Sequence, residues 1–181
     1  LIDMDSAVEV GKPIGVQALS TAFVAPEVTF HTPSGEIVFR VPKEVTAAAS
    51  TNEASAAPQE LTVLKAHPTF DIWSFAVVLY RVITHQPLLE AGDCDNLRSK
   101  RELTTLATWG AKALSGALAD AALEAEGTDD KERLMVCDLL GWCRRSDPAE
   151  RPQSCDERRA HAFFDKAGAV AVQEQEGETE V

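Results

Sequence analysis

The longest apolar stretch of this chain runs from Ile72 to Tyr80 and ends at Arg81. It is apolar on nearly every side of a helix, and it is too long for an ordinary strand. The sequence therefore predicts a helix over about 71–85, capped by Thr69 or Asp71, that lies inside a domain and is covered on most sides. The stretch is well short of the ~20 apolar residues that span a bilayer, so no membrane contact is expected from it.

Helical patterns follow this central helix, and a short strand pattern precedes it. Residues 28–40 alternate around Pro33-Ser34-Gly35 and predict a small β-hairpin, and residues 61–65 predict a short helix. Further helices are expected at 97–108, 109–125, 129–145 and 154–163. In the third of these, a stripe at helical spacing consists of Leu134, Cys137, Leu140 and Gly141, widened by Leu139 and Trp142. The fold class predicted is mainly α with a small β-hairpin insert.

Two segments have the composition of chain that cannot bury enough apolar surface to fold. Residues 43–60 consist largely of Ala, Ser, Thr, Glu and Pro, and residues 165–181 form an acidic Gln/Glu/Gly tail. We expect both segments to be disordered, because little hydrophobic burial offsets the loss of chain entropy.

The charge of the chain restricts its partners. The 181 residues carry 17 Lys and Arg against 29 Asp and Glu, a net charge of −12. Such a chain repels phosphate backbones and anionic lipid, so neither nucleic acid nor a membrane surface is an expected partner. The first residues carry Asp3 and Asp5 and no basic region, which argues against a signal peptide. The chain starts at Leu1 and lacks an initiating Met, so we expect a fragment or an incomplete gene product.

The cysteines and histidines do not have the spacing of metal ligands. The cysteines are Cys94, Cys137, Cys143 and Cys155, and no two of them are separated by the two-residue gap of a zinc knuckle. We interpret them as free buried thiols in a reducing compartment, which favours a cytoplasmic location.

The sequence contains an ordered series of short motifs. Asp3-Met4-Asp5 comes first, and Ser20-Thr21-Ala22-Phe23 leads into Ala25-Pro26-Glu27. The third, at the start of the apolar stretch, is Asp71-Ile72-Trp73-Ser74, and the last is Asp147-Pro148-Ala149-Glu150-Arg151-Pro152. Taken alone, Asp3 and Asp5 are either turn or cap residues or ligands for Mg²⁺, and Asp71 is a helix cap.

In this order the motifs resemble the second half of a protein kinase domain, from the Asp-Phe-Gly position onward. Residues 64–73 and 97–109 resemble the tyrosine-kinase-like group of serine/threonine kinases found in oomycetes. The resemblance covers residues 1–27 and about 65–164. It implies a partial kinase domain over 1–164: an activation segment at 3–27, an insert at 28–64 and a C-terminal helical lobe at 65–164.

The resemblance also assigns roles to single residues. Asp3 matches the Asp that holds Mg²⁺ on the nucleotide phosphates, although Asp5 replaces the family's Gly. Glu27 is expected to form a buried ion pair with Arg151. Asp71 matches an Asp that accepts backbone N–H bonds from the catalytic loop, in a motif that also contains Trp73. The residues on the substrate side of the activation segment are Ser20, Thr21 and Phe23; Ser20 and Phe23 resemble the serine/threonine type, and Ser20 taken alone is a loop hydroxyl.

Several parts of a kinase are missing from these residues: the Gly-rich loop, the Val-Ala-Ile-Lys strand and the His-Arg-Asp loop. We therefore expect no catalytic residue here, a general base encoded upstream of Leu1, and no activity from this chain alone. In the full-length protein, the resemblance implies transfer of the γ-phosphate of ATP, with Mg²⁺, to hydroxyl groups of a protein substrate. A pseudokinase or scaffold lobe is the alternative, and an unrelated helical adaptor is a third.

Overall fold

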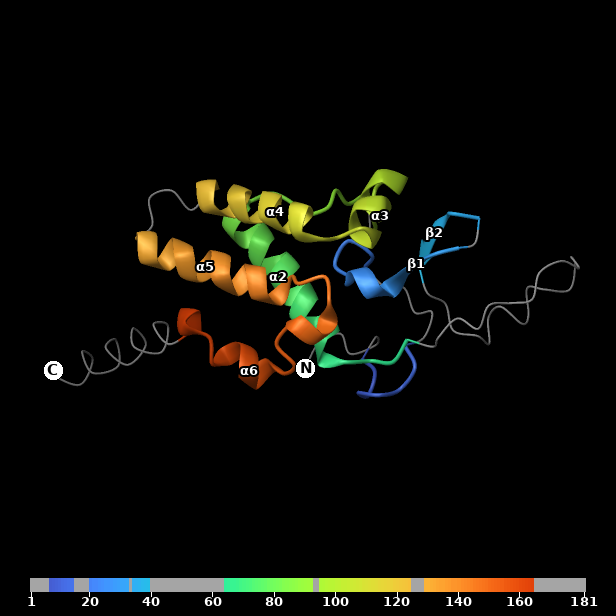
Figure 1. Ribbon diagram of the computed structural model, residues 1–181, viewed down its shortest axis with the longest axis horizontal. Coiled ribbons are helices and arrows are strands. Elements are labelled where there is room, and N and C mark those ends of the chain that lie inside the picture. Colours follow the sequence, from blue (N-terminus) through green and yellow to red (C-terminus); the bar gives the residue numbers. More distant parts are fainter. Residues whose placement is uncertain are drawn as a thin grey trace, which may run out of the picture.

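The computed structural model describes residues 7–14, 20–32, 34–39, 64–92, 95–124 and 129–164. These residues form a mainly helical structure with one small hairpin, as predicted (Figure 1). The chain start with Leu1, Asp3 and Asp5, residues 43–60 and the tail at 165–181 lie outside the described residues, so the predictions made for them stay predictions.

A short 3₁₀ helix and a hairpin follow the Ala-Pro-Glu motif. The 3₁₀ helix η1 covers Pro26–Val28, and the antiparallel strands β1 (Thr29–His31) and β2 (Ile37–Phe39) pair with Phe30 opposite Val38. The hairpin turns around Gly35, whose positive φ of 84° suits a residue without a side chain. The predicted hairpin is therefore confirmed.

The central helix α2 covers Pro68–Thr84 and begins earlier than predicted. Its N-cap is His67, whose side chain accepts a hydrogen bond from the backbone N–H of Thr69, and Pro68 occupies the first turn. The predicted caps, Thr69 and Asp71, are thus already inside the helix. The short helix expected at 61–65 is wrong for its last two residues, because Lys65 instead forms a β-bridge with Pro13.

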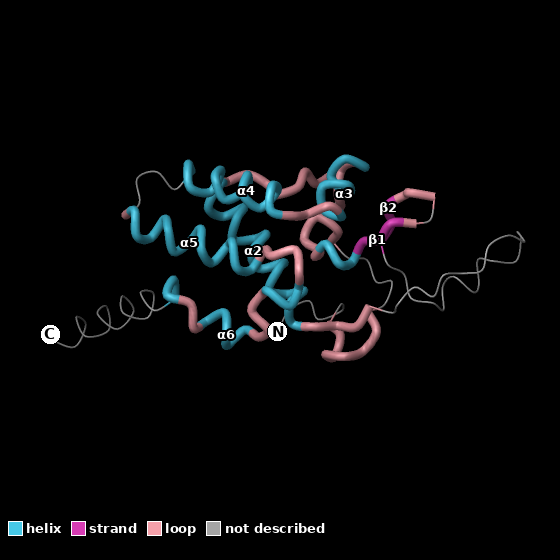
Figure 2. Tube along the Cα trace, in the orientation of Figure 1, coloured by secondary structure: helices cyan, strands magenta, loops and turns pink. Residues whose placement is uncertain are grey.

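In the described part of the chain, four further helices follow α2. They are α3 (Lys100–Ala107), α4 (Ala111–Glu124), α5 (Asp130–Cys143) and α6 (Cys155–Arg159), and a second 3₁₀ helix, η3, covers Pro148–Glu150. Figure 2 shows α4 and α5 side by side, with the hairpin at the far end of the molecule, and α2 contacts α4, α5 and α6. Helix α6 is shorter than the predicted segment because the chain turns at Ala160.

The core lies where α2 meets α4 and α5. Its buried residues on α2 are Ile72, Trp73, Ala76, Val77 and Tyr80, and those that meet them include Leu106, Trp109, Ala117, Ala121, Leu139, Leu140 and Cys143. The expectation that α2 is covered on most sides is only partly correct, because Val78 and Val82 are 50% and 63% exposed. Among the described residues, no helix combines the length and apolar composition needed to cross a membrane.

Two predictions about single side chains are corrected by the packing. Leu134, the first residue of the predicted stripe on α5, is 69% exposed, whereas Leu140 of the same stripe is fully buried. The thiols of Cys137, Cys143 and Cys155 are free, but only Cys143 is buried and Cys155 is exposed. Burial raises the pKa of the Cys143 thiol to about 11, so this side chain stays neutral and acts as part of the core.

The contrast between Leu140 and Leu134 gives a test of the core. We expect Leu140→Ala to lower the free energy of unfolding by about 2–5 kcal/mol, because it removes buried methyl groups and leaves a cavity. Leu134→Ala, on the same helix, should change it by less than about 0.5 kcal/mol. Urea unfolding followed by circular dichroism measures both, and equal losses would contradict this packing.

Candidate functional site

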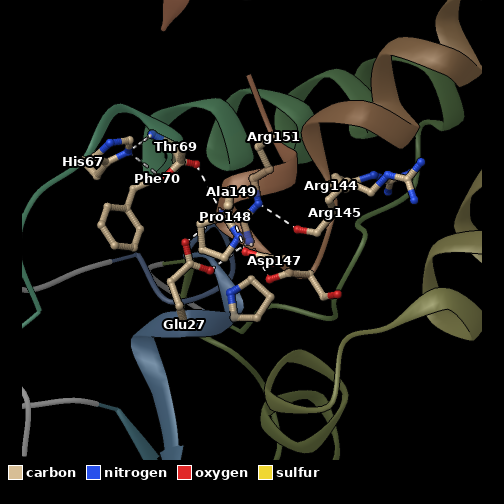
Figure 3. A network of polar contacts seen from close by, with 12 residues as sticks. Glu27, His67, Thr69, Phe70, Arg144, Arg145, Asp147, Pro148, Ala149 and Arg151 are labelled. Atoms are coloured by element: carbon tan, nitrogen blue, oxygen red, sulfur yellow. Dashed lines mark hydrogen bonds and ion pairs between the residues drawn. The ribbon is translucent and has the colours of Figure 1, made fainter. Parts of the chain in front are cut away.

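The Glu27 and Arg151 side chains form a bidentate ion pair, which joins segments near the two ends of the described chain. Arg151 Nη1 donates to Glu27 Oε1 at 2.7 Å, and Nη2 donates to Oε2 at 2.9 Å (Figure 3). The residues are 124 positions apart. The Arg151 side chain is completely buried and the Glu27 side chain is 16% exposed. The contact predicted from the sequence is present.

Two short 3₁₀ helices orient the Glu27 and Arg151 side chains toward each other. Glu27 lies on η1, which starts at a proline, and Arg151 follows η3, whose N-cap Asp147 accepts from the backbone N–H of Ala149 at 2.9 Å. Pro148 and Pro152 fix the backbone on both sides of the Arg151 turn. The spacing of the Asp-Pro-x-x-Arg-Pro motif therefore encodes one capped turn that directs an arginine inward.

Arg151 has a partner for each of its guanidinium N–H groups. Besides the two bonds to Glu27, Nε donates to the Arg145 carbonyl at 2.7 Å, Nη2 to the Ser146 carbonyl at 3.2 Å and Nη1 to the Thr69 carbonyl at 3.4 Å. A guanidinium has five N–H donors, so the group is fully satisfied. A buried charge is tolerated under this condition, because its lost hydration is replaced by hydrogen bonds and a counter-charge.

Aromatic rings contact the Arg151 guanidinium and connect the ion pair with the hydrophobic core. The Arg151 guanidinium lies over the Trp73 ring at 5.0 Å, and Trp73 meets Trp109 edge to face at 5.3 Å. A second guanidinium, from Arg144, lies 5.0 Å from the Tyr80 ring and 5.9 Å from the Trp109 ring. Cations over aromatic faces are favourable contacts, and they link the ion pair to the interior of the helical structure.

Arg144 differs sharply from Arg151, and no sequence pattern singled it out. It is also fully buried, but its Nη1 and Nη2 atoms have no hydrogen-bond partner among the described residues. Burial lowers the pKa of this guanidinium to about 10, although the group still carries its proton at neutral pH. Figure 3 shows its side chain directed away from the Glu27 pair.

The segment before Glu27 is fastened to the loop that precedes α3. Thr21 Oγ1 accepts from the backbone N–H of Leu97 at 2.8 Å and donates to Asn96 Oδ1 at 3.2 Å. Ser74 Oγ, on α2, donates to the Phe23 carbonyl at 2.9 Å. Thr21 and Phe23 belong to one predicted group, but no sequence signal identifies Asn96 and Ser74 as their partners, since these contacts join segments that are far apart in sequence.

The remaining predicted residues occupy different surroundings. Ser20 is exposed, Phe23 is half-buried against the core, and Trp73 is fully buried. Asp71 is exposed on the first turn of α2 and lines a largely apolar cavity of about 620 Å³, together with Val8, Val24 and Phe70.

The predictions for the chain start concern residues before Ala7, where the described part of the chain begins. Asp3, the expected Mg²⁺ ligand, and Leu1, upstream of which the general base is expected, both lie before that point. Within the described part of the chain, no group of three or more His, Cys, Asp or Glu side chains could hold a metal ion. The metal ligand and the general base therefore stay predictions.

Comparison of the chain with protein-family models, with curated proteins and with solved structures gave no match. The site is therefore defined by its geometry: a stretch at 20–28 attached to a helical structure by one buried ion pair and several loop hydrogen bonds.

A double-mutant cycle tests the ion pair. Arg151→Ala and Glu27→Ala should each lower the free energy of unfolding by about 3–5 kcal/mol, because each leaves a largely buried group without its counter-charge. The double variant should lose less than the sum. The matched control is the exposed Arg133–Asp130 pair on α5, whose coupling should be at most about 0.5 kcal/mol. Additive losses at Glu27 and Arg151 would contradict the prediction.

Proposed function

We propose that this chain is the C-terminal part of a protein serine/threonine kinase, and that residues 65–164 correspond to its helical lobe. The observation that carries the proposal is the ion pair between Glu27 of the Ala-Pro-Glu motif and Arg151 of the Asp-Pro-x-x-Arg-Pro motif. The kinase resemblance predicts this contact, whereas an unrelated helical adaptor gives no reason for two residues 124 positions apart to meet.

The attachment of residues 20–28 supports the same proposal. In a kinase, this stretch receives the substrate next to the phosphorylated hydroxyl, so it must be held in one position. Here Thr21 is bonded to Asn96 and Leu97, and Ser74 is bonded to the Phe23 carbonyl, while the Ser20 side chain is left at the surface. The arrangement fixes the backbone and leaves a hydroxyl accessible, as a substrate-binding role requires.

The surroundings of Asp71 are also consistent with a missing neighbour. A carboxylate on the first turn of a central helix would accept hydrogen bonds from the backbone N–H groups of a packed loop, and here it is exposed beside an apolar cavity of about 620 Å³. On the proposal, the catalytic loop encoded upstream of Leu1 fills this space. The exposed Val78 and Val82 on α2 would likewise be covered by upstream helical structure.

ATP and Mg²⁺ belong to the proposal only for the full-length protein. Asp3, the candidate metal ligand, is not among the described residues, and those that are described offer no cluster of ligands for a metal ion. The described residues therefore do not fit these groups by themselves, and no catalytic step is assigned to them. Their proposed contribution is to hold residues 20–28 in place and to support the upstream lobe.

The first test concerns the chain as it stands. We expect the 181-residue chain to release no ADP above background when it is mixed with ATP, Mg²⁺ and a generic protein substrate. The reason is that phosphoryl transfer depends on positioning and charge stabilisation, which the chain lacks without the nucleotide lobe and general base. Turnover that disappears in Asp3→Asn would refute this expectation.

The second test concerns the chain extended by its upstream coding sequence. The extended protein should phosphorylate Ser or Thr residues, and Asp3→Ala should reduce turnover by several orders of magnitude, because the metal ion stabilises charge on the transferring phosphate. Glu9→Gln, an exposed acidic position of the same segment, is the matched control and should keep wild-type turnover. Phosphoamino-acid analysis of the product decides the residue type.

Two results would speak against the enzyme. Wild-type turnover in Asp3→Ala would mean that the protein does not use this position. An extended protein that folds and keeps the Glu27–Arg151 contact, but has no turnover, would favour the scaffold alternative.

A further inference from the structure

A second cavity lies beside the Trp109 ring and is lined by charged and apolar side chains. It has a volume of about 610 Å³ and lies between α3, α4 and the C-terminal half of α2. Tyr80, Trp109 and Ala117 provide its inner wall. None of the individual site residues named for the kinase proposal lines it, and the inference below does not rest on that proposal.

The part of the cavity beside α3 and the first turn of α4 is positively charged. Arg101 from α3 and Lys112 from the first turn of α4 both line it, both are exposed, and neither side chain has an ion pair or hydrogen bond to the described residues. A third positive charge lies behind the wall, where the Arg144 guanidinium packs against the Tyr80 and Trp109 rings. Its Nε donates to the Leu140 carbonyl at 3.4 Å, whereas Nη1 and Nη2 have no hydrogen-bond partner among the described residues. Three cations without carboxylate partners among the described residues are notable in a chain of net charge −12.

The other end of the cavity is negatively charged. Asp120 lines it two helical turns after Lys112, and among the described residues the one hydrogen bond of its carboxylate is a long one of 3.5 Å, accepted by Oδ2 from the Tyr80 hydroxyl. The carboxylate therefore has free acceptor capacity. Lys112 and Asp120 are eight positions apart on the helix, which corresponds to about 12 Å along its axis. An ion of one sign would be attracted at one end and repelled at the other.

The space between the two ends is open and partly apolar. Gly116 lies on the same face of α4 as Lys112 and Asp120, and a Cβ atom built on it would meet nothing within 4 Å. Leu88, Ala113 and the Trp109 ring line the cavity beside it. The absence of a side chain at Gly116 leaves the space along α4 between Lys112 and Asp120 unobstructed.

We propose that this cavity binds a short zwitterionic molecule of about tripeptide length. Its carboxylate lies between Arg101 and Lys112, its ammonium group contacts Asp120, and its apolar body lies over Gly116 against the Trp109 ring. An extended tripeptide spans about 10 Å, which suits the separation of the charged ends. Charge alone fixes the direction in which the molecule lies.

The probe is the tripeptide Ala-Phe-Ala, used with free ends, with an acetylated N-terminus and with an amidated C-terminus. Each is titrated into the ¹⁵N-labelled 181-residue chain, and the amide signals of Ala113, Gly116 and Ala117 are followed. The free peptide should bind with saturation in the millimolar range and shift these signals. Amidation should weaken binding about fivefold to tenfold, because it removes the charge that faces Arg101 and Lys112.

Variants separate the two ends of the site. Arg101→Gln/Lys112→Gln should weaken binding of the free and the acetylated peptide by a similar factor. Asp120→Asn should weaken only the peptides with a free ammonium group. Gly116→Leu should abolish binding by filling the space between Lys112 and Asp120, and it should fold because nothing lies within 4 Å of the added Cβ. The matched controls are Lys131→Gln, for loss of an exposed charge, and Ala119→Leu, for added bulk on the exposed part of α4.

Three outcomes would overturn the proposal: no saturation by the free peptide at about 20 mM, well above the millimolar affinity expected, equal affinity for all three peptides, or binding that survives in Gly116→Leu. Shifts that occur mainly around the Asp71 cavity would also overturn it, since they would locate peptide binding at the proposed kinase site.

Discussion

The buried guanidinium of Arg151 is the interaction on which the rest of this structure depends. A charge that is removed from water must recover its hydration energy from the protein, and here five hydrogen bonds supply it. Those bonds come from η1, from the start of α2 and from the turn after α5. Satisfying one side chain therefore fixes the relative positions of three segments, which hydrophobic burial alone would leave free to slide.

Arg144 is a second buried arginine, and its charge is compensated in a different way. Its guanidinium is just as deeply buried, but the Tyr80 and Trp109 rings take the place of a carboxylate. Burial disfavours the charged form and lowers the pKa of the Arg144 guanidinium to about 10, and attraction to aromatic faces compensates this less than a bidentate ion pair would. Trp73 and Trp109 stand between the two arginines, so the same aromatic core connects the ion pair with the cavity along α4.

Much of the fold followed from local sequence. The apolar stretch around Ile72–Tyr80 predicted the central helix, and alternation around Gly35 predicted the hairpin, because both patterns reflect interactions within a few residues. The predictions were wrong where contacts with a distant segment determine the local structure. The start of α2 was misplaced since the cap is His67, and Lys65 pairs with Pro13 instead of joining a helix. Leu134 fits the helical stripe on α5 but stays at the surface.

The sequence by itself determined the order of the motifs, and the resemblance that they carry named Glu27 and Arg151 as partners before any geometry was known. Only the tertiary structure decided how completely that arginine is satisfied, that Thr21 is bonded to Asn96, and that Arg101, Lys112 and Asp120 border one cavity. The reason is physical: helix and turn formation depend on near neighbours in the chain, whereas burial and charge pairing depend on which distant surfaces pack together.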